Sequence, residues 1–129
     1  MAVTTGTPWD LALDQGKHAR PLYSGRAISA RAAYQRALYG RAVLVDLRTD
    51  DQRRSHGRFG PALTAVTVPP RALVTWLVRR NTTGDVIVIS QDGTQADDVT
   101  EALADVSLAQ LTYVPGGVAA WRSAGLPLE

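Results

Sequence analysis

The stretch Asp85-Val86-Ile87-Val88-Ile89-Ser90, followed by Gln91-Asp92-Gly93-Thr94, decides the fold class of this chain. Its four consecutive β-branched apolar residues predict a strand that is buried on both faces. The polar, Gly-containing segment after it predicts a loop, and the apolar spacing beyond the loop predicts a helix to about residue 104. Ligands of parallel α/β sheets bind outside the carboxyl ends of the strands, so the segment after Ser90 is the first candidate site.

On either side of this strand the chain alternates further predicted strands with predicted helices. The apolar runs predict strands at 42–47, 64–68 and 111–114, and helical spacing predicts helices at 30–39, 71–79 and 118–124. The segment between the first two strands is polar and Gly-containing, and we expect it to be a loop. This alternation predicts one α/β domain with a mostly parallel central sheet and helices on both faces.

The domain organisation follows from length and composition. A chain of 129 residues suits one domain, which we expect at 28–129, after an extended N-terminal lead-in at 1–27. No apolar run approaches the roughly 20 residues that a membrane span requires. The N-terminus lacks a basic segment followed by a long apolar core, so no secretory signal is predicted and a cytoplasmic location is expected.

Two features of composition restrict the chemistry. The chain has no cysteine, which excludes disulfides, thiolate metal ligands and thiol catalysis; we expect no metal and no cofactor. Residues 1–80 carry thirteen basic and five acidic residues, and 81–129 carry one basic and seven acidic. The arginines are dispersed, without aromatic interleaving, which favours a mutually compensating surface over a nucleic-acid site.

Three stretches, in this order, resemble the rhodanese (sulfurtransferase) family. The first, 43–48, ends in Asp46-Leu47-Arg48 and is similar to the family's Asp-x-Arg motif. The second, Gly57-Arg58-Phe59-Gly60-Pro61-Ala62, departs from Gly-His-Ile-Pro-Gly-Ala, because Arg58 replaces His and the Pro-Gly order is reversed. The third runs from Pro115-Gly116-Gly117 through Trp121 to Gly125-Leu126-Pro127, close to the family's closing motifs.

The resemblance implies a rhodanese-like domain whose sulfur-carrying Cys position is occupied by Ser90. It also implies an anion- or ligand-binding loop and supporting residues, namely Ser90, Gln91, Asp92, Gly93, Thr94 and Gln95, supported by Asp46, Arg48 and Arg58. Persulfide transfer requires a thiolate that is partly ionised near neutral pH, and a serine hydroxyl is not. The related phosphatase chemistry needs a Cys and an Arg, and the Arg position falls on Gln95 or Ala96.

Several functions remain open at this stage. The leading hypothesis is a catalytically inactive, regulatory rhodanese-like module that binds a protein or a small anion through the loop and Arg58. The alternative is a sulfurtransferase, or persulfide carrier, whose Cys was replaced by Ser90. A hydrolase with Ser90 as nucleophile and His56 as base is disfavoured, because no Gly-x-Ser-x-Gly elbow is present and His56 is expected in an exposed loop. Loop amides before a helix can attract anions, whereas Asp92 repels them unless Arg48 or Arg58 pairs with it. Oligomeric state is not predicted.

Overall fold

The computed structural model describes residues 23–24, 26–80, 84–104 and 110–129. Its sheet has six strands in the order β1-β2-β6-β5-β3-β4. Only the pair of β1 and β2 is antiparallel, and the other four pairings are parallel. The mostly parallel α/β sheet that the sequence predicts is therefore confirmed. The strands are β1 (Tyr23–Ser24), β2 (Ala27–Ile28), β3 (Val43–Asp46), β4 (Val66–Thr67), β5 (Asp85–Ile89) and β6 (Gln110–Tyr113).

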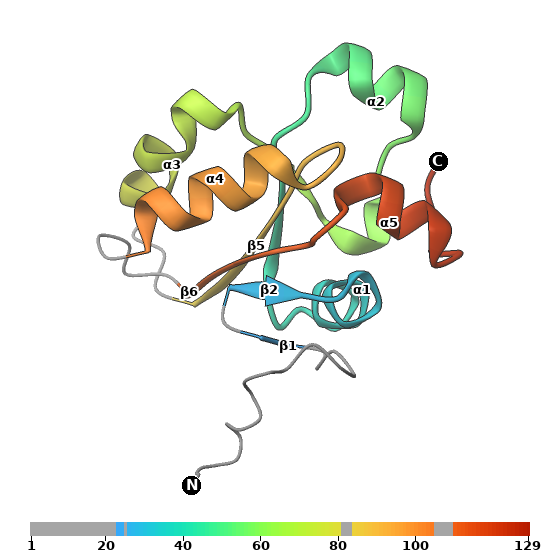
Figure 1. Ribbon diagram of the computed structural model, residues 1–129, viewed down its shortest axis with the longest axis horizontal. Helices are drawn as coiled ribbons and strands as arrows, with labels where there is room; N and C mark the ends of the chain where they lie inside the picture. Colours follow the sequence, from blue (N-terminus) through green and yellow to red (C-terminus); the bar gives the residue numbers. More distant parts are fainter. Residues whose placement is uncertain (1–22, 25, 81–83, 105–109) are drawn as a thin grey trace, which may run out of the picture.

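Helices cover both faces of this sheet (Figure 1). The α-helices are α1 (Ala30–Leu38), α2 (Asp50–His56), α3 (Leu73–Arg80), α4 (Thr94–Leu103) and α5 (Gly117–Ser123), and two short 3-10 turns lie at Pro61–Leu63 and Pro70–Ala72. The side chains of β5 alternate between two cores, as expected for a central strand. Ile87 and Ile89 face the core under α1 and α5, whereas Val86 and Val88 face the core under α3 and α4.

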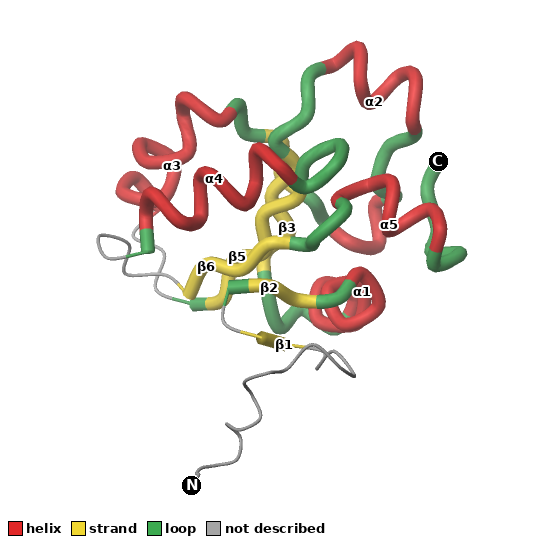
Figure 2. The backbone as a smooth tube through the Cα atoms, in the orientation of Figure 1, coloured by secondary structure: helices red, strands yellow, loops and turns green. Residues whose placement is uncertain are grey.

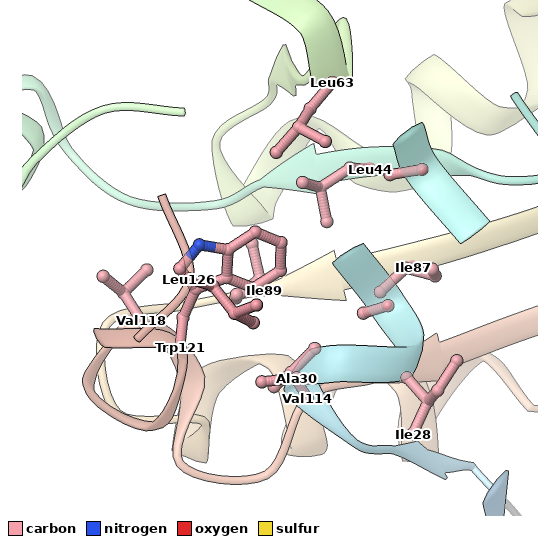
Figure 3. Close-up of a cluster of buried hydrophobic side chains, with 12 residues drawn as sticks. Ile28, Ala30, Leu44, Leu63, Ile87, Ile89, Val114, Val118, Trp121 and Leu126 are labelled. Carbon is pink, nitrogen blue, oxygen red and sulfur yellow. The ribbon is translucent and has the colours of Figure 1, made fainter. Parts of the chain in front are cut away.

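The core under α1 and α5 is centred on Trp121, which is fully buried (Figure 3). Its indole packs edge-on against Tyr34 and Phe59, and its Nε1 donates a hydrogen bond of 3.0 Å to the Pro127 carbonyl. This bond satisfies the one polar atom of a large apolar side chain. The closing motif, which the sequence singled out, thus fastens the end of the chain to the core.

Helix α2 is absent from the sequence prediction, which expected a loop between the strands at 42–47 and 64–68. Thr49 caps the helix: its hydroxyl accepts from the Gln52 amide, and the Gln52 side chain accepts from the Thr49 amide. Gly57 ends it with a positive φ of 101°. The Thr-x-x-Gln spacing of this capping box was the available signal. His56 is accordingly the last residue of a helix, although it is exposed as expected.

Two further differences lie at the strand ends. The predicted strand at 64–68 is reduced to Val66–Thr67, because Thr64 adopts a left-handed conformation (φ 47°) after the 3-10 turn. Strands β1 and β2 show that the sheet begins before residue 28, within the segment assigned to the lead-in. Residues 1–22 and 25 of that lead-in lie outside the described residues.

Candidate functional site

The candidate loop connects the carboxyl end of β5 to α4, at the edge of the sheet where the sequence analysis places a ligand site (Figure 2). Ser90, Gln91, Asp92 and Gly93 form the loop, whereas Thr94 and Gln95 are the first two residues of α4. The six residues expected to bind a ligand therefore divide between a tight four-residue turn and a helix start.

The side chain of Ser90 points into the loop rather than out of it. Ser90 is 3% exposed, and its Oγ accepts hydrogen bonds of 3.2 Å from the amides of Gly93 and Ala96. Ala96 is the third residue of α4, whose N-cap position is held by Gly93 and has no side chain. The Ser90 hydroxyl therefore supplies the cap that Gly93 lacks, and it occupies amides that would otherwise face an anion.

A second loop amide is also satisfied from within the chain. The Oδ1 atom of Asp92 accepts a hydrogen bond of 3.0 Å from the Thr94 amide, and the Asp92 side chain is exposed. Within the described residues no ion pair joins Asp92 to Arg48 or Arg58. The negative charge at the mouth of the loop is thus uncompensated, which opposes the binding of a small anion.

The first turn of α5 packs directly against the loop, backbone to backbone. The Val118 amide donates to the Ser90 carbonyl (3.0 Å) and the Ala119 amide to the Gln91 carbonyl (3.2 Å). A Cβ atom added to Gly117, whose φ is +56°, would lie 2.1 Å from the Ser90 carbonyl oxygen and 2.7 Å from the Gly93 nitrogen. Only glycine permits this approach. From the sequence, the double glycine belongs to a motif that resembles the family, but nothing in the motif indicates that Gly117 contacts the loop.

Asp46 and Arg48, which the resemblance implies as supporting residues of the loop, form a buried polar anchor. The Arg48 side chain is fully buried. Its Nε donates to Oδ1 of Asp46 at 3.0 Å, and one terminal nitrogen donates to Oδ2 of Asp46 at 3.0 Å. The other terminal nitrogen donates to the Gln91 side chain at 3.4 Å, and the guanidinium lies 5.4 Å from the centre of the Phe59 ring. Because Asp46 neutralises it in a bidentate pair, Arg48 holds the loop in place but offers little charge to a ligand.

Arg58 lies apart from this network. Its side chain is exposed, and its backbone pairs in both directions with Glu129. No hydrogen bond or ion pair among the described residues joins it to the loop. Arg53 was not singled out from the sequence, but it contacts the anchor: its side chain donates to the Arg48 carbonyl and pairs with Asp50. The hydrogen bond from Arg53 lowers the pKa of the Asp50 carboxyl.

Asp97, in the first turn of α4, has a structural role. Asp97 binds Arg26 at 2.8 Å and so ties the helix to the segment before β2. This hydrogen bond with Asp97 raises the pKa of Arg26, against an opposing effect of desolvation. Asp97 therefore joins α4 to the segment before β2 through an ion pair, in addition to its favourable place near the helix N-terminus.

Neither metal chemistry nor a Ser-His pair is assembled from the described residues. No group of three or more His, Cys, Asp or Glu side chains there could hold a metal ion. His56 ends α2 with an exposed side chain, and no hydrogen bond in the described parts of the chain connects it to Ser90. The helices of the described segments include none that is long and apolar enough to cross a membrane.

The comparisons with known proteins identify the fold. The sequence matches no family model and no curated protein. A rhodanese-related protein from Thermoplasma volcanium superposes with a TM-score of 0.66 at 20% identity, over 81% of this chain and 97% of that one. A thiosulfate sulfurtransferase from Pseudomonas aeruginosa gives 0.64 at 19% identity, over 88% of this chain but only 21% of that one.

A third structure has unknown function and is described as a possible tyrosine phosphatase from Rhodopseudomonas palustris. It gives a TM-score of 0.69 at 17% identity over 88% of this chain and all of that chain. These identities are too low to transfer an activity, but the shared topology is clear. The chain has the rhodanese-like fold that its motifs predict, and it has no cysteine.

Proposed function

We propose that this rhodanese-like domain is a non-catalytic module that binds a protein partner through the loop at 90–93 and the first turn of α4. The observation that supports the proposal is the inward hydroxyl of Ser90, which accepts from two loop amides. An oxygen in this position cannot carry sulfane sulfur, because the chemistry requires a thiolate nucleophile. In this proposal the hydroxyl stabilises the loop as a rigid structure.

The same geometry favours a protein over a small anion. Ser90 and Asp92 together satisfy three amides at the start of α4, and Asp92 adds an exposed negative charge. Three exposed side chains remain for recognition, those of Asp92, Thr94 and Gln95. The first turn of α5 holds the backbone of the loop beside them, so binding would require little ordering of the loop.

Site-specific photo-crosslinking tests this proposal in the cells that produce the protein. A photoreactive residue at the exposed position of Gln95 should capture one protein, and an added Asp92→Arg change should abolish the adduct. The matched control places the same residue at Tyr39, which is 71% exposed next to Arg36, at the amino ends of the strands. No adduct at Gln95, or the same adduct from Tyr39, would argue against a partner at the loop.

An anion titration tests the hypothesis that the loop binds a small anion and not a protein. Sulfate or thiosulfate should leave the backbone amide resonances of residues 90–96 unshifted, because the amides of Gly93, Thr94 and Ala96 already have acceptors and Asp92 repels the ion. Saturable shifts confined to these amides would instead show that the loop binds anions, and the protein-binding proposal would then lose its basis.

A further inference from the structure

Helix α3 presents an apolar and basic surface to solvent. The described residues include three large hydrophobic side chains that are clearly exposed, and two of them lie one turn apart on α3: Val74 at 51% and Val78 at 72%. Arg71 and Arg79 are exposed near the two ends of the helix, and within the described residues neither forms an ion pair. Exposed valines at this spacing leave an unpartnered helix face.

Helix α4, which covers the same face of the sheet beside α3, presents the opposite charge (Figure 1). Its exposed residues include Asp98, Glu101 and Ala102, and the helix contains no basic residue. Asp98 forms no ion pair among the described residues, and the nearest cation to Glu101 is Arg26 at 3.9 Å. A basic surface and an acidic surface therefore lie side by side without neutralising each other.

We propose that one combined surface binds a second copy of the same chain: Arg71 in the 3-10 turn before α3, Val74, Val78 and Arg79 on α3, and Asp98 and Glu101 on α4. Both helices follow a strand of the parallel sheet and return to the next one, so they run in the same direction. A two-fold axis between them and parallel to them places α3 of each copy over α4 of the other. Each basic helix then meets an acidic one, twice in the dimer, and the valines are covered.

The charge pattern favours a second copy over other occupants. A nucleic acid or a uniformly acidic protein attracted to α3 would be repelled by α4 beside it, and a basic partner attracted to α4 would be repelled by α3. A self-complementary surface meets neither obstacle. The formal net charge of the chain is only +2, so long-range repulsion between copies is weak. This inference rests on other observations than the proposed function, because Asp98 and Glu101 lie beyond the loop and the first turn of α4.

Sedimentation equilibrium of the full chain tests the dimer directly. Across a dilution series at low salt, the apparent mass should rise from one chain to two, and added salt should lower it because exposed charges are screened. Val78→Asp should weaken dimerisation at least about tenfold, since it places a charge in the apolar contact. Tyr39→Asp, which changes the third exposed hydrophobic residue away from α3, should leave the dimer intact.

A charge exchange tests the pairing of α3 with α4. One variant carries Arg71→Glu and Arg79→Glu, and the other carries Asp98→Arg and Glu101→Arg. Each should be monomeric alone, because the exchanged positions on one helix then bear the same charge as the facing positions on the other. An equimolar mixture should form a heterodimer, since every α3 and α4 contact again joins opposite charges. Circular dichroism should show unchanged folding, as all four residues are exposed.

Three results would overturn the inference. The first is a wild-type chain that stays monomeric throughout the dilution series. The second is a dimer that persists in either charge variant alone, and the third is a mixture that remains monomeric although the wild type dimerises.

Discussion

Replacement of Ser90 by alanine should destabilise the domain without changing its fold. Among the described residues, the change removes the one side-chain oxygen that accepts from the amides of Gly93 and Ala96, both of which belong to buried residues. A buried donor left without a partner costs about 1–3 kcal/mol. Loss of both bonds should therefore lower the free energy of unfolding by at least about 2 kcal/mol. At about 4 °C per kcal/mol for a domain of this size, Tm should fall by roughly 8 °C.

Urea unfolding followed by tryptophan fluorescence measures this change, and an unchanged m-value would show that the same surface is exposed on unfolding. Amide hydrogen exchange should also accelerate at Gly93 and Ala96. The matched control is Ser55→Ala, because Ser55 is exposed on α2 and makes no hydrogen bond through its side chain in the described structure. Its effect should stay within about 0.5 kcal/mol. If Ser90→Ala is equally mild, the argument that the hydroxyl stabilises the loop is refuted.

Four other predictions concern the elements around the loop. Gly117→Ala should destabilise more than Ser90→Ala and disturb the loop amide resonances, because its Cβ would lie 2.1 Å from the Ser90 carbonyl oxygen; a wild-type Tm would show that the turn is looser than described. Trp121→Ala should cost about 3–5 kcal/mol by urea unfolding, as expected for a fully buried aromatic residue, and a loss below about 1 kcal/mol would contradict its central place in the core. Thr49→Ala removes the cap of α2 and should cost about 1 kcal/mol, whereas an unchanged midpoint would mean that α2 does not depend on its capping box. Because the pKa of Asp50 is lowered in the folded state, its contribution is present above the unfolded pKa and is lost as the pH falls through the folded value; Asp50→Asn should reduce the acid destabilisation, and identical acid titrations would exclude the ion pair with Arg53.

The sequence predicted the centre of the fold better than its periphery. The run at 85–90 specified a buried strand because β-branched residues on both faces leave few alternatives, and the structure places it in the middle of the sheet. The region 49–57 was assigned to a loop because its residues are polar and show no apolar periodicity. Helix α2 forms there through its capping box and its C-terminal glycine, and such local signals are easily missed beside a polar composition.

The candidate site was only partly predictable for a related reason. Motif resemblance located Ser90 and the anchor of Asp46 and Arg48, since these depend on position along strands. It could not show that the Ser90 side chain turns inward, because the direction of the hydroxyl depends on the Gly93 and Ala96 amides that the folded loop brings to it. The resemblance also grouped Arg58 with the loop, whereas its backbone pairs with Glu129 instead.

In our proposal the loop as a whole differs from a sulfur-carrying site and does not merely lack a thiol. Transfer of sulfur from thiosulfate to cyanide by the variant Ser90→Cys tests this most directly, with mass spectrometry to detect a sulfur atom added to the new cysteine. We expect neither turnover nor a stable adduct, because Asp92 repels the dianion and Arg48 is neutralised by Asp46. Rapid turnover by Ser90→Cys would contradict this account and would support a sulfurtransferase site in which a serine replaced the cysteine.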